Sequence, residues 1–238
     1  MEAVVGRVSA LFRYPVKSMA AEALDAVEVS WHGLAGDRRW AFVRADSAGR
    51  GFPWLTLRER NDLHFYRPRL AEPDRPDASA TVVRTPDRRE LEVLDPAFAA
   101  ELGEGVRGMK LDRGAFDSAP LSLLTTRTLA GLGTLIGHAG RDLDVARFRP
   151  NLVVEPLAEG AYPEDDWVGR TVRLGGVRMR VDRRDRRCVV VNVDPRTVRR
   201  NPEVLRAIVR ERGGCLGVYG STVAPGRVAV GDPVALEG

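Results

Sequence analysis

Cys188 ends the stretch DRRDRRC and directly follows four arginines, Arg183, Arg184, Arg186 and Arg187. A cysteine thiol has an ordinary pKa near 8.5, and adjacent guanidinium groups stabilise its thiolate form. A thiolate is a soft metal ligand and a nucleophile. The residue types and their order therefore mark Cys188 as a candidate for metal binding or covalent chemistry.

The apolar run RCVVVNVD (187–194) predicts a β-strand that contains this cysteine. Side chains alternate along a strand, so Arg186 would share the face of Cys188 and Arg187 would point to the other face. Cys188 also fits a purely structural role, as a small buried hydrophobe at a strand start. The local sequence leaves both roles open.

Other common sites are not predicted. His32, His64 and His138 lack the spacing of a zinc site. GLGTLIG (131–137) is one residue too long for a dinucleotide fingerprint, and GGCLGVYG (213–220) lacks the Lys-Ser/Thr of a phosphate-binding loop. The chain contains no G-x-S-x-G hydrolase elbow.

The two cysteines stand 27 positions apart, which excludes a disulfide framework, a C-x-x-C zinc motif and an all-cysteine iron–sulfur cluster. The first residues, EAVVGRVSALFRYPVKS, fit neither a signal peptide nor a membrane span, so we expect a cytoplasmic protein. The net charge of +4 comes from arginine, since Lys17 and Lys110 are the only lysines. Arginine suits phosphate groups, although most of these arginines also fit a solvated surface.

Short runs rich in β-branched residues predict a mainly β (α+β) protein with few helices. The expected strands are 5–16, 26–31, 38–46, 80–85, 90–95, 151–156, 171–182, 187–194 and 227–237, and the expected helices are 96–105, 121–137 and 201–214. TPDRR and the glycines at 175–176 predict hairpin turns, and Asn201 and Pro202 a helix start. A Pro-rich loop (71–80) and a break (108–120) suggest two domains, 1–115 and 116–238.

Several motifs resemble the MOSC domain and the MOSC N-terminal β-barrel domain. The matching stretches are RFRPNLVV (147–154), AYPEDDW (161–167), RCVVVNVDP (187–195), GCLGVYG (214–220) and PGRVAVGDPV (225–234), with YPVKSM (14–19) and GDRRWAFV (36–43) in the N-terminal half. They follow the family's order and cover nearly the whole chain. The resemblance implies a MOSC-type β-barrel domain preceded by a smaller N-terminal β-barrel domain.

The resemblance also implies a molybdenum cofactor, in which Cys188 coordinates the metal and a pterin dithiolene supplies two more sulfurs. It implies that Asp165 relays protons near the metal. The implied cofactor contacts are Lys17, Ser18, Arg38, Thr125 or Thr126, Arg149, Asn151, Arg187 and Tyr219. Pyridoxal phosphate binding is not expected.

Taken singly, these residues also have structural explanations. Lys17 fits a solvated strand end, Arg38 a charge that flanks a hairpin, Asp165 an acidic turn and Tyr219 a core position. Asp194-Pro195 predicts a turn. The chain also departs from the reductase branch of the family beside the metal ligand, where Arg186 replaces a common serine and Val191 and Asn192 replace paired threonines. These departures affect the expected substrate range.

The implied function is a molybdenum-dependent oxidoreductase that reduces small N-hydroxylated molecules. No ferredoxin-like segment follows Gly238, so we expect electrons to come from separate proteins, with no nucleic acid and no membrane span involved. One alternative is a carrier that holds cofactor or persulfide sulfur on Cys188 without reductase turnover. Another is an arginine-rich barrel that binds nucleic-acid phosphates, although aromatic residues are only 6% of the chain.

Overall fold

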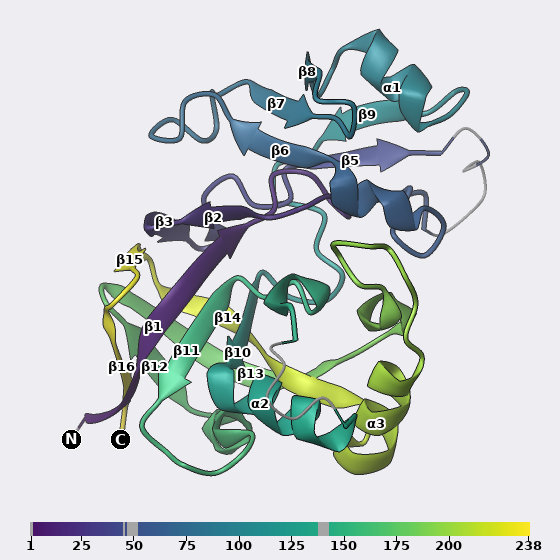
Figure 1. Cartoon of the computed structure of the whole chain (residues 1–238). Helices are drawn as coiled ribbons and strands as arrows, with labels where there is room; N and C mark the ends of the chain where they lie inside the picture. The colour runs from purple at the N-terminus through teal and green to yellow at the C-terminus, as the bar shows by residue number, and fades with distance from the viewer. Residues whose placement is uncertain (1, 45, 47–51, 138–142) are drawn as a thin grey trace. The chain divides into compact units, whose positions relative to one another are not determined.

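The computed structural model describes residues 2–44, 46, 52–137 and 143–238 (Figure 1). His138 and position 45 of the predicted strand 38–46 lie outside the described residues. The chain divides into two compact units. We call residues 1–12, 23–35 and 118–238 the barrel unit, and residues 13–22 and 36–117 the second unit. No helix in the described part of the chain is long and apolar enough to cross a membrane.

The barrel unit is built on a sheet with the strand order β11-β10-β14-β13-β12-β16-β1-β2. These strands are β1 (Ala3–Arg13), β2 (Glu22–Leu24), β10 (Leu121–Thr125), β11 (Leu152–Pro156), β12 (Thr171–Leu174), β13 (Val177–Arg186), β14 (Cys215–Ala224) and β16 (Pro233–Leu236). Strand β1 pairs with β16 on one edge and with β11 on the other, so the sheet closes into a barrel of seven strands within the described residues. A separate small sheet joins β15 (Gly226–Ala229), β3 (Ala26–Ser30) and β4 (Gly33–Leu34). The predicted mainly β class is confirmed.

Both predicted hairpins are present. β12 pairs with β13 across Gly175 and Gly176, and in the second unit β7 (Thr81–Arg84) pairs with β8 (Glu90–Glu92). Gly175 has a φ of 56°, a backbone conformation that a side chain would strain. These turns were predictable because their sequence signals are local.

The prediction of one helix over 121–137 is wrong for its first part. Residues 121–125 form β10, which pairs in parallel with β11 and antiparallel with β14, and the helix α2 (Thr126–Leu135) begins only afterwards. All five residues of β10 are buried. A strand buried on both faces is continuously apolar, and such a run cannot be told from a buried helix by its periodicity.

The prediction of a strand over 187–194 is also wrong. β13 ends at Arg186, opposite the first residue of β14, Cys215. Before Cys215 the chain turns away through Gly213 and Gly214, whose φ angles are 61° and 82°. Residues 189–192 therefore have no strand to pair with and form the 3₁₀ helix η4 (Val189–Asn192).

Strand β14 was not predicted, although it pairs with both β10 and β13. Its glycines concealed it, because glycine is disfavoured within strands. Two of them are required by packing. A Cβ on Gly217 would lie 2.7 Å from the Leu123 carbonyl oxygen, and one on Gly220 would collide with the backbone of Arg180.

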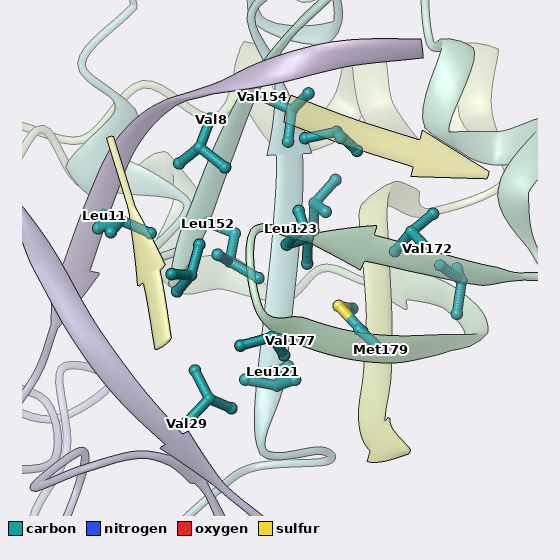
Figure 2. Packing of buried hydrophobic residues seen from close by; sticks show 14 of the residues in the cluster. Val8, Leu11, Val29, Leu121, Leu123, Leu152, Val154, Val172, Val177 and Met179 are labelled. Atoms are coloured by element: carbon teal, nitrogen blue, oxygen red, sulfur yellow. The ribbon is translucent and has the colours of Figure 1, made fainter. Parts of the chain in front are cut away.

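The barrel interior is filled mainly with aliphatic side chains (Figure 2). Along β13 the burial alternates from Val177 to Val181, so that Met179 and its two neighbours on that face point inward while the arginines between them point outward. Val8 and Leu11 on β1 are each 1% exposed and belong to the same cluster. The inward face of each strand therefore determines how the barrel packs.

A second apolar cluster lies under α2, η4 and α3 (Glu203–Arg212), and Figure 1 shows α2 and α3 beside each other. Its buried members are Leu124, Leu132, Phe148, Val191, Val204, Ala207, Ile208 and Leu216. The helix predicted over 201–214 begins at Glu203, and the Asn201 side chain accepts a hydrogen bond from the Glu203 amide at 3.1 Å. Short 3₁₀ helices, η2 (Val145–Arg147) and η3 (Pro163–Trp167), complete this region.

The second unit contains a two-stranded and a three-stranded sheet. Its elements are β5 (Trp40–Val43) paired with β9 (Arg107–Lys110), the sheet β6 (Arg67–Leu70), β7 and β8, the 3₁₀ helix η1 (Asn61–Phe65) and the helix α1 (Pro96–Leu102). Phe42 and Phe98 pack edge to face with ring centroids 5.4 Å apart. The domain boundary near residue 115 stays a prediction.

Candidate functional site

Cys188 occupies the N-cap position of η4, in extended backbone conformation, and is half-buried. Its carbonyl oxygen accepts a hydrogen bond from the Val191 amide at 3.2 Å. Val191 is 4% exposed within the second apolar cluster, whereas Val189 is 55% exposed. One buried valine thus anchors the short segment that carries the thiol. The prediction that Arg186 and Cys188 share one face of a strand does not apply, because the strand ends at Arg186.

Arg187 connects three parts of the barrel unit through hydrogen bonds. It donates to the carbonyl oxygens of Leu216 at 2.8 Å and Phe148 at 2.7 Å, and it pairs with Asp185 at 2.8 Å. The side chains of Arg187 and Asp185 are 7% and 1% exposed. A buried guanidinium that is matched by a carboxylate holds the backbone just before Cys188 in one position.

Two of the other three arginines of this stretch have partners of their own. Arg183 donates to the Ser118 hydroxyl at 2.7 Å and lies over the Tyr219 ring, 5.7 Å from its centroid. Arg184 donates to the Arg212 carbonyl oxygen at 2.9 Å. Arg186 is exposed. The structure therefore does not concentrate four guanidinium groups on the thiol.

Asn151 joins strands β1 and β10 near the same end of the barrel. Its amide donates to the Phe12 carbonyl oxygen at 3.2 Å and accepts from the Ser122 amide at 3.3 Å. The Ser122 hydroxyl donates to Asp185 at 3.3 Å, and Ser122 stands opposite Tyr219 in the sheet. Asn151 is therefore linked through Ser122 to the Asp185–Arg187 pair.

Arg149 directly follows Phe148, whose carbonyl oxygen accepts a hydrogen bond from Arg187, and it precedes Asn151 by two positions. The φ angle of Arg149 is 54°. A non-glycine residue in this region is uncommon and carries backbone strain. The structure thus brings the segments of Arg149, Asn151, Arg187, Cys188 and Tyr219 together through hydrogen bonds and strand pairing. These five predicted residues form one neighbourhood.

Asp165 belongs to a different group of contacts. It pairs with Arg212 and, at 3.3 Å, with Arg184. The Arg212 guanidinium lies over the Tyr162 ring at 3.8 Å from the centroid. The predicted proton relay is therefore a carboxylate held between two arginines.

Thr125 is fully buried, and its hydroxyl donates to Glu164 at 2.7 Å. The Thr128 hydroxyl contacts both carboxyl oxygens of Glu164, at 2.7 and 2.8 Å. Thr126 is the first residue of α2 and is half-buried. Of the two threonines considered for cofactor contact, Thr125 is therefore already bonded within the barrel unit.

The family resemblance points to Asp165, and its buried neighbour Glu164 was not predicted. Glu164 has no exposed surface, and burial raises the pKa of its carboxyl, while the hydrogen bonds from Thr128 and Thr125 oppose that shift. Three acidic residues in a row gave no signal for which one is buried. The turn that begins with Tyr162 at a φ of 63° directs Glu164 inward.

Lys17, Ser18 and Arg38 belong to the second unit. The Lys17 ammonium donates to the Ala115 carbonyl oxygen at 2.8 Å and pairs with Asp117. Arg38 pairs with Asp37, which raises the pKa of Arg38 although burial alone would lower it. Ser18 and Arg38 have φ angles of 67° and 49°. Their contact with a cofactor stays a prediction.

Family models match nearly the whole chain. The model of the MOSC domain matches residues 110–235, and that of the MOSC N-terminal beta barrel domain matches residues 5–118. The chain belongs to the MOSC domain family. The predicted architecture of a MOSC barrel domain preceded by a MOSC N-terminal barrel domain is thereby confirmed.

Relatives of this MOSC protein fall into two groups. It is 27% identical to mitochondrial amidoxime reducing component 2 of Bos taurus, over 97% of this chain and 83% of that protein. It is 26% identical to the molybdenum cofactor sulfurase of Drosophila grimshawi, over 94% of this chain but only 34% of that protein. The chain thus spans about a third of the length of the sulfurases it matches.

The solved structure of the YUAD protein from Bacillus subtilis has the same fold, with a TM-score of 0.54 at 14% identity, covering 99% of this chain and 97% of that one. Among the described residues no group of three or more His, Cys, Asp or Glu side chains could hold a metal ion. A molybdenum cofactor needs no such group, because the pterin brings its own sulfurs. One half-buried thiol, as the soft ligand from the protein, fits that chemistry.

Proposed function

We propose that this MOSC protein binds the molybdenum cofactor through Cys188 and reduces small N-hydroxylated molecules. The observation that carries the proposal is the half-buried thiol on η4, whose backbone Arg187 and Val191 hold in place. It lies in the stretch that resembles the family's cysteine motif. Relatives in both groups carry names connected with this cofactor or with amidoxime reduction.

The reaction breaks the N–O bond of the substrate. Two electrons and two protons convert R₂N–OH to R₂NH and water, and the molybdenum centre, when bound, supplies the two-electron chemistry. Cys188 would hold the metal, and Arg149, Tyr219 and Thr126 would contact the pterin or its phosphate. Asn151 and Arg187 already make hydrogen bonds within the barrel unit, so they would also stabilise the backbone around this site.

Lys17, Ser18 and Arg38 remain proposed cofactor contacts. Asp165 remains the proposed proton relay. Its pairing with Arg184 and Arg212 supports a second role, in which the carboxylate fixes these two arginines beside β13.

A carrier of cofactor or sulfur is the second candidate. It is favoured by the sulfurase relatives, which match over nearly all of this chain. The reductase is taken as the first candidate because the amidoxime-reducing relative matches 97% of this chain. A carrier would bind molybdopterin but would not turn over N-hydroxylated substrates with any electron donor.

The test is elemental analysis for molybdenum together with pterin fluorescence after acid oxidation, on protein from a host that makes the cofactor. We expect about one metal and one pterin per chain, and reduction of a benzamidoxime when a chemical donor supplies electrons. Wild-type protein without molybdenum and pterin would refute the proposal.

Cys188→Ala should lose the metal and the activity. Cys215→Ala is the matched control, because Cys215 is also a half-buried cysteine but stands opposite Arg186 in the sheet. It should keep both metal and activity. Equal metal content in the two variants would show that Cys188 is not the ligand.

A further inference from the structure

A hollow of about 470 Å³ lies on the outer surface of α3 and the end of η4. It is lined by Asn192, Pro202, Leu205, Arg206, Val209 and Arg210. Val209 is 56% exposed at this hollow, and Arg206 and Arg210 are 69% and 64% exposed. The surface therefore has an apolar centre with arginines at its edge. We call it the α3 groove.

The segment that forms this surface has a surplus of positive charge. Residues 196–212 contain six arginines and two glutamates, a net charge of +4. Such a surplus attracts an acidic partner and speeds its association.

The α3 groove is also connected to the candidate site. Its residue Asn192 ends the 3₁₀ helix that begins directly after Cys188. At about 2 Å of rise per residue, the two backbones are about 8 Å apart. The Asn192 side chain accepts from the Leu205 amide at 2.9 Å, and its carbonyl oxygen accepts from the Asn201 amide at 2.7 Å. α3 and the cysteine segment are thus tied together.

We infer that the α3 groove is the docking site of an acidic electron-transfer protein that inserts an apolar side chain between the arginines. An apolar centre with a polar rim rich in arginine is typical of protein interfaces. Residues 196–212 contain no aromatic side chain on which a base could stack, which disfavours nucleic acid. The inference rests on the proposed function, because the reduction consumes two electrons that have to reach the site.

Binding of two acidic probes, a plant-type [2Fe–2S] ferredoxin and a flavodoxin, tests this inference without any need for activity. We expect at least one of them to bind. Because salt screens the attraction between charges, the affinity should fall about tenfold or more when the salt concentration is raised from about 20 to about 200 mM. Arg206→Gln with Arg210→Gln should weaken that binding about tenfold at low salt. If neither probe binds, the inference is wrong.

Arg7→Gln with Arg227→Gln is the matched control. Those arginines are 67% and 68% exposed and pair with Glu155 and Glu28, just as Arg206 and Arg210 pair with Glu203 and Glu211. Both double variants remove the same charge, so only its position differs. The control should change the affinity less than about twofold, and an equal loss in both would show general attraction rather than a docking site.

The apolar centre is tested by Val209→Asp, which places a negative charge in the groove and should abolish binding. Val230→Asp, at a valine that is 45% exposed on the loop after β15, is its control and should leave binding unchanged. The same variants are tested with vesicles of anionic phospholipid and with single-stranded DNA. If one of these ligands binds more strongly than the acidic proteins, and the groove variants abolish that binding, the surface belongs to that ligand instead. Either result would overturn the inference.

The two proposals fail separately. Protein that lacks molybdenum but binds the acidic probe at the α3 groove would refute the proposed function and leave the docking site standing. Protein that carries molybdenum and reduces the substrate, but binds the probes equally well with and without Arg206 and Arg210, would refute the docking site alone.

Discussion

Glu164 is a carboxyl group without exposed surface whose contacts are the hydroxyls of Thr125 and Thr128 and the Thr125 amide, at 3.2 Å. It joins η3 to the start of α2 and so fixes the position of its neighbour Asp165. No cation contacts it among these partners, and its raised pKa reflects the cost of burying the charge. At the scale of single residues, the acidic stretch thus contains one buried structural group and one group paired with arginines.

Glu164→Gln should change how stability depends on pH. Because the pKa of Glu164 is raised on folding, the native state binds a proton that the unfolded state has released, so wild-type stability falls as pH rises from about 4.3 through the folded pKa. Glutamine has no such dependence. The free energy of unfolding of the wild type should therefore decrease relative to the variant by up to about 1.4 kcal/mol per pH unit in that window.

Urea unfolding between pH 4 and pH 8 measures this difference. Asp166→Asn is the control, since it removes an exposed carboxylate of the same turn. The stability of this variant should depend on pH as that of the wild type does. Parallel curves for wild type and Glu164→Gln would show that the buried carboxyl does not titrate differently on folding.

Strand β14 shows at the scale of elements why glycine-rich sequence can still form the centre of a sheet. Gly217 has a φ of 74° and lies where β14 passes the Leu123 backbone and the Arg187 guanidinium. A side chain there would displace both the β10 neighbour and the residue that braces Cys188. The glycines of GCLGVYG therefore allow close approach in a strand that pairs on both edges.

Gly217→Ala should destabilise the protein by about 2–4 kcal/mol, because the new Cβ adds overpacking to left-handed backbone strain. Gly213→Ala is the control. Its φ is 61°, but no atom lies within 4 Å of the new Cβ, so only the strain of about 1 kcal/mol remains. Thermal and urea unfolding of both variants checks the difference, and equal losses would show that the Leu123 contact is unimportant.

At the scale of the whole molecule, strand β1 joins distant parts of the sequence. It pairs with β16, near the end of the chain, and with β11, and it contributes Val8 and Leu11 to the barrel core. Without it, β16 and β11 would become open edges with unpaired backbone groups. Closure of the barrel thus depends on the first strand of the chain.

Deleting residues 2–8 should make the backbone amides of β16 and β11 exchange faster, or unfold the barrel unit altogether. Hydrogen–deuterium exchange, followed for individual peptides, measures the protection of these two strands. Val4→Asp, at a position of β1 that is 56% exposed, is the control and should preserve protection. Unchanged protection of β16 and β11 after the deletion would contradict the role of β1 in closure.

Much of the fold was predictable because its signals are local. The hairpin turns at 85–89 and 175–176, the short helices after Asp95 and Asn201, and the alternating strands β12 and β13 follow from turn residues, caps and periodicity. The turn at Asp194 was also predictable, and its carboxylate accepts from the amides of Arg196 and Thr197 at 2.9 and 3.0 Å. Motif order further indicated the family, which the family models confirm.

The sequence by itself determined the β-rich class, the family and Cys188 as the candidate ligand, since these depend on residue type and order along the chain. Only the tertiary structure decided that Cys188 starts a 3₁₀ helix, that residues 121–125 form a strand, and that Glu164 rather than Asp165 is buried. Each of these depends on which segment lies alongside. A backbone becomes a strand only where a partner offers hydrogen bonds, and a carboxylate is buried only where distant hydroxyls receive it.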